Sequence, residues 1–227
     1  MGSSAGESTG PNCYLGAVNR VHWFLLSAFA VVLLWSGIHP HDYFTWFLEV
    51  VPALVGIIVL VVTWPPFRFT MLVYAALCVH AIILAVGGHY TYAEVPLGFW
   101  MEHAFGLVRN DYDRIGHFAQ GFVPALVARE ILVRRGVIAR RKWMFFLVVS
   151  ICLAISAAYE LFEWLVALAS GSGADAFLGA QGDPWDTQED MATAIVGAVT
   201  ALLFFSRWHD RLIGRMDDDK TMAQAKG

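Results

Sequence analysis

Residues 46–63 read WFLEVVPALVGIIVLVVT, an almost unbroken apolar run with the roughly 17 to 25 residues of a membrane-crossing helix. The rest of the chain is similar, because 58% of its 227 residues are hydrophobic and 15% are charged. A soluble domain of this size cannot hide so many apolar residues. We therefore expect an all-α fold, a polytopic transmembrane bundle of about six spans: Val21–Ile38, Trp46–Thr63, Thr70–Val86, Gly116–Val133, Trp143–Leu168 and Glu189–Ser206.

The fourth span has the weakest pattern. Polar and helix-breaking residues interrupt it, namely His117, Gln120, Pro124, Arg129 and Glu130, so a short, broken or re-entrant helix is an alternative to a full span. The other boundaries are supported by tryptophans at or near the ends of the runs, where an amphipathic ring prefers the headgroup layer: Trp23, Trp35, Trp46, Trp64, Trp143 and Trp208.

Basic residues predict the orientation of the bundle. Only Arg109 and Arg114 fall on one side of a six-span arrangement, and the other side holds most of the rest: Arg20, Arg68, Arg134, Arg135, Arg140, Arg141, Lys142, Arg207, Arg211, Arg215, Lys220 and Lys226. Because cytoplasmic loops are enriched in Lys and Arg, we expect both termini in the cytoplasm. Residues 1–18 are then a disordered cytoplasmic tail, 19–210 the transmembrane domain, and 211–227 a polar cytoplasmic tail, disordered from Asp217.

Polar residues of three spans are expected at one level near the outer surface. The segment 179–198 reads GAQGDPWDTQEDMATAIVGA and carries four acids into the start of an apolar helix. In the fifth span, Glu160 lies about 26 Å from Trp143 at the helical rise, which is the outer water line. The fourth and sixth spans begin at the same level. Charges beside hydrocarbon are costly and mark this level as the place to look for function.

Helical spacing indicates which of these residues could act together. Asp113 and His117 are separated by four residues, Glu160 and Glu163 by three, and Asp186 and Asp190 by four, so each pair can share a helix face. A His among carboxylates can bind Zn, Mn or Fe, whereas carboxylates alone favour Mg or Ca. Without a metal, crowded carboxylates could form an acid and base pair.

We assign candidate roles to residues at this level. The candidate ligands of one divalent metal ion are His117, Glu160, Glu163, Asp186 and Asp190. The candidate catalytic residues are His117, Glu163 and Asp113, and the candidate substrate-binding residues are Arg114, Gln120, Trp185 and Gln188. Structural roles are the alternative: the acids around Asp186 as helix caps, the glutamates in wet headgroups, and His117 as a packing residue.

Four long motifs, in this order, resemble the YjdF-type bacterial inner-membrane proteins, a family of unknown function. They are GGHYTYAEVPLG at 87–98, RNDYDRIGHFAQGFVPALVARE at 109–130, YELFEW at 159–164 and LGAQGDPWDTQEDM at 178–191. The resemblance spans essentially all six helices, and it implies a multi-pass protein of the bacterial inner (plasma) membrane.

A fainter likeness is to the VanZ-like membrane proteins, which are associated with glycopeptide-antibiotic resistance. Asp113 and His117 resemble the start of their pattern, Glu160 resembles their lone intramembrane Glu, and Asp190 with Gly197 resembles its end. Ala194 stands where the pattern has Asn. This likeness implies a role in the cell envelope.

Two functional classes follow, with the lipid bilayer as partner in both. The first is an enzyme that hydrolyses or transfers a group of a lipid or envelope substrate at the outer face, with His117 or Glu163 as base. The second is a small ion- or proton-coupled transporter that uses the same acids. A structural membrane protein is a third class. Nothing predicts a nucleic-acid partner, and no Ser or Cys nucleophile motif, Walker loop or dinucleotide motif is present.

Overall fold

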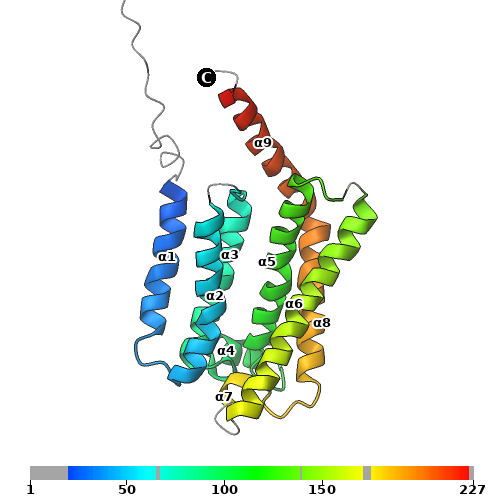
Figure 1. Ribbon diagram of the computed structural model, residues 1–227. Coiled ribbons are helices and arrows are strands. Elements are labelled where there is room, and N and C mark those ends of the chain that lie inside the picture. The colour runs from blue at the N-terminus through cyan, green and yellow to red at the C-terminus, as the bar shows by residue number, and fades with distance from the viewer. Residues whose placement is uncertain (1–19, 65–66, 139, 171–174, 225–227) are drawn as a thin grey trace, which may run out of the picture.

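The computed structural model describes residues 20–64, 67–138, 140–170 and 175–224, which are helices joined by short connections. The long helices of the described part run beside one another in Figure 1. They are α1 (Arg20–Ser36), α2 (Tyr43–Thr63), α3 (Met71–Tyr90), α5 (Tyr112–Arg134), α6 (Arg141–Ser170) and α8 (Asp186–Thr200). The predicted all-α helical bundle is confirmed.

Among the described residues, four helices are long and apolar enough to cross a membrane: α2, α3, α6 and the continuous helix Asp186–Met216. Helix α1 is a shorter apolar helix of 17 residues. Helix α5 has 23 residues but carries several charged side chains, so it falls outside that set. It is nevertheless one continuous helix through Pro124, not a broken or re-entrant one.

The prediction of a disordered segment from Asp217 differs from the structure. Helix α8 continues through a π-helical turn (Ala201–Phe205) into α9 (Ser206–Gln224). Extending an existing helix adds one hydrogen bond per residue without a new nucleation step, so polar residues can remain helical here. The predicted N-terminal tail, residues 1–18, and Cys13 lie outside the described residues.

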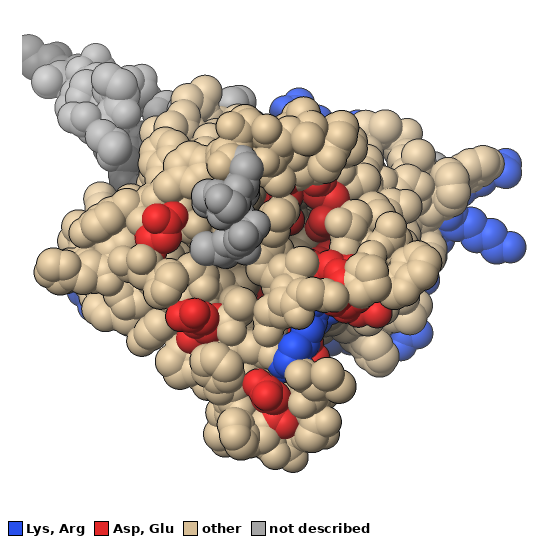
Figure 2. All heavy atoms as spheres, turned by 90° about the horizontal axis from the view of Figure 1, so that it is seen from below, with Lys and Arg blue, Asp and Glu red and all other residues tan. Residues whose placement is uncertain are grey.

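The two ends of the bundle differ in charge. At the basic end lie the start of α1 and the whole of α9, so both are on the same side of the bundle (Figure 1). At the acidic end lie three short helices: η3 (Tyr92–Glu94), α4 (Pro96–Phe105) and α7 (Asp175–Leu178). Acidic side chains are visible across this end in Figure 2.

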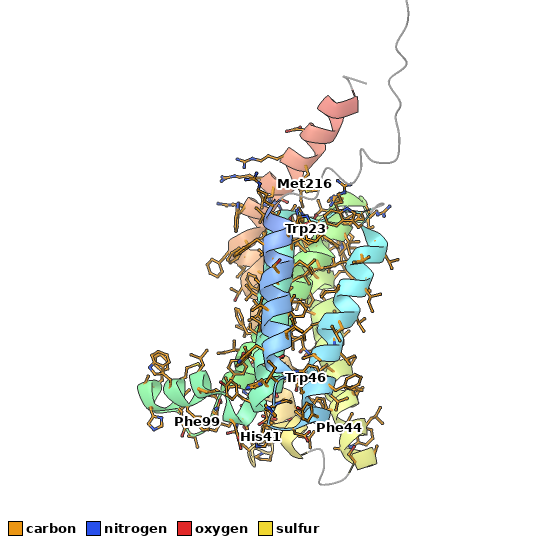
Figure 3. All side chains as sticks on the ribbon, turned by 90° about the vertical axis from the view of Figure 1, so that its left-hand side faces the viewer. Trp23, His41, Phe44, Trp46, Phe99 and Met216 are labelled. Carbon is orange, nitrogen blue, oxygen red and sulfur yellow. The ribbon has the colours of Figure 1, made fainter. Side chains whose placement is uncertain are left out.

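The sequence analysis treated α4 as part of a connection. Pro96 opens it at the first helical position, and Gly106 ends it with a φ of 67° that favours glycine. Helix α4 projects sideways from the bundle in Figure 3, where Phe99 is labelled. Trp100 and Phe105 are exposed, which is typical of a helix that lies along a membrane surface.

Helices α5 and α8 pack closely through two glycines. A Cβ on Gly121 would overlap the carbonyl oxygen of Ala194, and a Cβ on Gly197 would overlap that of Phe118. Small residues of this kind let the backbones of membrane helices approach each other. The close contact holds the acidic ends of α5 and α8 together, where the candidate site lies.

Helix α6 presents a buried face with a period of four residues: Met144, Val148, Cys152, Ser156 and Glu160. Met144, Val148 and Cys152 of this face join an apolar layer with Leu126 of α5 and Ala198 of α8. The first polar residue of this buried face is Ser156, so the candidate site lies beyond the apolar layer, towards the acidic end.

Candidate functional site

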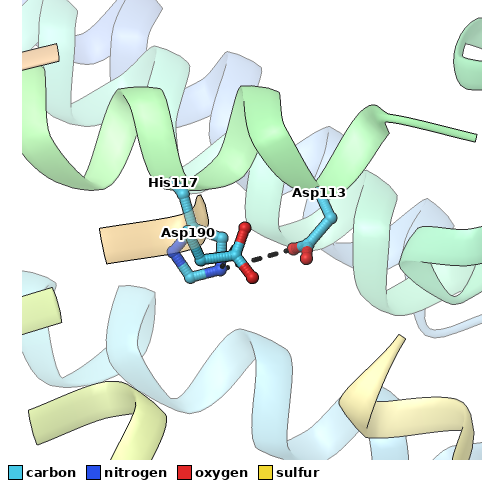
Figure 4. A group of neighbouring side chains, drawn as sticks. All are labelled: Asp113, His117 and Asp190. Atoms are coloured by element: carbon cyan, nitrogen blue, oxygen red, sulfur yellow. Dashed lines mark ion pairs between the residues drawn. The ribbon is translucent and has the colours of Figure 1, made fainter. Parts of the chain in front are cut away.

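His117 on α5 lies at the centre of a group of carboxylates (Figure 4). Its Nε2 atom is 3.5 Å from Asp113 Oδ1, one helical turn earlier. The same atom is 3.7 Å from Asp190 Oδ1 on α8. One ligand atom from each of these three residues lies within 4.8 Å of the other two. Three side chains from two helices could therefore meet one metal ion.

Glu160 of α6 completes the group from a third helix. Its Oε1 atom lies 3.7 Å from His117 Nε2 and receives no hydrogen bond from the described residues. The residue is only 7% exposed. A buried carboxylate oxygen normally has a partner, so this atom is available to a group that binds beside His117.

Gln120 orients the imidazole ring. His117 Nδ1 is 3.0 Å from Gln120 Oε1, one turn further along α5. An amide oxygen only accepts hydrogen bonds, so Nδ1 carries the proton. Nε2 is then the ring nitrogen that faces the carboxylates. An imidazole held by its other nitrogen in this way is the usual arrangement of a metal ligand.

Two arginines bind the acids around this group. Arg114 contacts Asp190 and lies 2.7 Å from Glu189 Oε2. Arg109 donates to Asp186 Oδ1 at 2.6 Å. Burial lowers the pKa of the Arg109 guanidinium, but the hydrogen bond and charge of Asp186 outweigh it, so the pKa is raised and Arg109 stays charged. These pairs hold the start of α8 against the start of α5.

A cavity of about 150 Å³ opens beside His117. A cavity of this size holds a small molecule or a few waters. Its lining has no Lys or Arg among the described residues and includes several polar groups: Glu49, His80, Tyr92, Asp113, Tyr159 and Glu163. The cavity is therefore acidic on one side and adjoins the candidate metal ligands.

Comparison with known proteins gives the family. A family model described as "Predicted membrane protein (DUF2238)" matches residues 21–211. The chain belongs to this DUF2238 family. It is similar to the inner membrane protein YjdF of Escherichia coli (strain K12), with 52% identity over 185 residues, which cover 82% of this chain and 88% of the relative. No solved structure matches the chain significantly.

The DUF2238 chain is thus an integral, multi-pass protein of the inner membrane, as predicted. The roles assigned to individual residues stay predictions, as does the likeness to VanZ-like proteins. The structure brings four predicted site residues together: Asp113, His117, Glu160 and Asp190. Glu163 is partly buried and lines the cavity instead.

The remaining predicted site residues lie apart from the centre. Asp186 pairs with Arg109 rather than with His117, and Arg114 is occupied by acids. Gln120 acts on the His117 ring. Trp185 and Gln188 are exposed and do not line the cavity.

Sequence reasoning missed Glu49, which is 3% exposed in α2 and accepts a hydrogen bond from Tyr159 Oη at 3.4 Å. A signal for it was available, because it is the acid within the apolar run 46–63, and ionisable residues inside spans are commonly functional. His80 carried the same kind of signal, because it is an ionisable residue inside the predicted span Thr70–Val86, whereas Tyr92 had none. They reach the cavity through the packing of η3 and α3.

A second buried polar cluster lies at the basic end. Glu130 is fully buried and accepts hydrogen bonds from the backbone and hydroxyl of Thr70, at 2.9 and 2.7 Å. Arg134 donates to it at 2.7 Å, and His209 of α9 lies 2.9 Å away. The sequence analysis did not single out His209. Both Glu130 oxygens are satisfied here, so this cluster ties the start of α3 to α5 and α9.

Proposed function

We propose that the protein binds one divalent metal ion between α5, α6 and α8 and uses it to hydrolyse or transfer a group of a lipid or cell-envelope substrate. The observation that carries the proposal is the convergence of Asp113, His117 and Asp190 within 4.8 Å, with the unpartnered Glu160 Oε1 atom 3.7 Å from His117 Nε2. A His with carboxylates suits Zn, Mn or Fe.

Charge balance supports an ion at this point. Three carboxylates surround one imidazole, and Arg114 contacts only Asp190 among them. Buried charges are unfavourable unless they are paired or coordinate a metal. A divalent cation would give Asp113 and Glu160 the cationic partner that the described arginines do not supply.

The surrounding residues fit a reaction beside such an ion. A bound metal polarises a carbonyl or lowers the pKa of water. With His117 as ligand, Glu163 is left as the general base, because it lines the same cavity without belonging to the ligand group. Gln120 would position His117, and the two arginines would position Asp190 and Asp186.

An ion- or proton-coupled transporter is the alternative, and it needs polar groups that continue through the bundle. The apolar layer of Leu126, Val148, Cys152 and Ala198 lies between the candidate site and the Glu130 cluster. This layer favours a site confined to the acidic end.

The test is the metal content of the protein purified in detergent, measured by elemental analysis. We expect about one Zn, Mn or Fe per chain, as in other sites with His and carboxylate ligands. Asp190→Asn and Glu160→Gln should each lose it, since they keep the shape of the side chain and remove the charge. Glu189→Gln is the matched control, because Glu189 is exposed and its ion pair among the described residues is with Arg114.

Retention of the ion by both neutralised variants, or a wild-type protein that binds none of these metals after reloading, would overturn the proposal. If the neutralised variants melt at a higher temperature and their ion binding is unchanged, the charged acids destabilise the fold and do not bind the ion.

A further inference from the structure

A second, larger cavity lies between α1, α2 and α3. Helices α1 and α2 both pack on α3, and α1 stands apart from α2 in Figure 1. The space between them measures about 510 Å³, within the range of small-molecule sites. We call it the apolar crevice, after its lining, which includes Leu25, Phe29, Ile57, Leu60, Leu77 and Cys78.

The apolar crevice adjoins the acidic cavity beside His117. Pro52, His80 and Leu84 line both spaces. The apolar crevice extends from these residues towards Trp64 and His22, near the basic ends of α2 and α1. A molecule with one end beside His117 could therefore continue past His80 into an apolar space.

The acidic cavity restricts the polar end of such a molecule. Its volume of about 150 Å³ fits only a small group. Glu49, Asp113 and Glu163 line it without a Lys or Arg among the described lining residues. An anionic headgroup would find no Lys or Arg partner among the described lining residues, whereas a hydroxyl, ester or amide would find hydrogen-bond partners there.

We propose that the substrate is a single-chain lipid with a small uncharged head, such as a monoacylglycerol, whose head lies beside His117 and whose alkyl chain fills the apolar crevice. The proposal rests on the proposed function, because it names the substrate of that site. Apolar walls accommodate the chain through the hydrophobic effect and packing contacts, and the three shared lining residues place the two cavities side by side.

Gly56 offers a specific test of the chain position. It lies inside α2, lines the apolar crevice, and a Cβ at this position would meet no atom within 4 Å. Gly56→Leu would therefore place a side chain in the crevice from a position where its Cβ has open space, and the helix would gain a better helix former. Gly214→Leu is the matched control, since Gly214 lies exposed on α9, where a Cβ also meets nothing.

The experiment titrates full-length protein in detergent with monoolein and follows the complex by native mass spectrometry. Gly56→Leu should bind about tenfold more weakly than wild type, because the leucine displaces two or more methylenes of the chain. Gly214→Leu should bind like wild type. Oleyl phosphate, with an alkyl chain of the same length and a charged head, should bind more weakly than monoolein.

A second measurement locates the chain. In a variant with Cys13 and Cys152 replaced by Ala, monoolein should slow alkylation of Cys78, which is partly buried in the crevice. Unchanged alkylation, equal binding by Gly56→Leu, or equal weakening by Gly214→Leu would overturn the chain position. Equal or tighter binding of oleyl phosphate would contradict the proposal that the head of the substrate is uncharged.

The metal measurement separates this inference from the proposed function. Monoolein binding is measured with and without prior chelation, and Gly56→Leu should keep the metal content of wild type. A protein that holds its ion and binds no monoolein contradicts the inference alone. A protein that binds monoolein in the crevice and holds no ion contradicts the proposed metal chemistry alone.

Discussion

Gly121→Ala should both destabilise the bundle and disturb the candidate site. Gly121 lies one helical turn after His117 on α5, and the Ala194 oxygen that a new Cβ would overlap lies one turn after Asp190 on α8. The obstacle is a backbone atom, so a change of rotamer cannot relieve it. The two helices must separate next to the pair that the proposed metal ion needs.

The size of the effect follows from the overlap. Adding atoms to a tightly packed interior lowers the free energy of unfolding by about 1 to 3 kcal/mol. For a chain of this size, about 1 kcal/mol changes the melting temperature by roughly 2 to 4 °C. We therefore expect the melting temperature to fall by about 2 to 12 °C, with a weaker affinity for the bound ion.

The assay is thermal unfolding in detergent, with ion content measured on the folded fraction. Gly56→Ala is the control, because it makes the same chemical change in a bundle helix where a Cβ has open space. It should be neutral or slightly stabilising, since alanine is a better helix former.

Gly197→Ala provides a further check on the same contact. Its Cβ would overlap the backbone of Phe118, so it should cost a similar amount alone. The double variant should cost less than the sum, because one helix separation relieves both overlaps. If Gly121→Ala matches Gly56→Ala in melting temperature, or the two costs add fully, the reasoning is wrong.

Two further predictions concern the ends of the bundle. Val108, at the acidic end, and Gly214, on α9, are both exposed, so a cysteine at either position is open to a reagent on its own side of the membrane. In a cysteine-free background on intact cells, Val108→Cys should react with an impermeant thiol reagent and Gly214→Cys should not, because the predicted orientation places α9 in the cytoplasm. The reverse pattern would contradict that orientation. Glu130→Gln should lower the free energy of unfolding by about 3 to 5 kcal/mol, measured as a fall in melting temperature, because it breaks a buried charged cluster. Asp210→Asn is the control and should cost at most about 1 kcal/mol, because the Asp210 side chain is 42% exposed. Equal losses would show that the Glu130 cluster is not what holds α9.

Much of the fold could be predicted because membrane spans are read from local composition. The run 46–63 matches α2 in all but its first turn, and the run Trp143–Leu168 lies within α6. Helix α4 and the helical continuation to Gln224 were missed. Both are polar or short enough that neighbouring structure, not composition, decides whether they are helical.

The level of the candidate site follows from the amino-acid sequence alone. Depth along a helix depends only on residue count and rise, so residue numbers are enough to place Glu160, His117 and Asp190 in one layer. Helical spacing also predicted that Asp113 and His117 share a face, and they do.

Packing between helices selects which of the arginine-bound acids also reaches His117. Asp186 and Asp190 share a helix face in the sequence, yet Asp186 pairs with Arg109 and Asp190 approaches His117. The rotation of α8 about its axis makes this choice, and the contacts of Gly121 and Gly197 set that rotation. Glu49 likewise joins the cavity through the packing of α2 against α3. Contacts between helices depend on both helices, so they cannot be predicted from the periodicity of one helix alone.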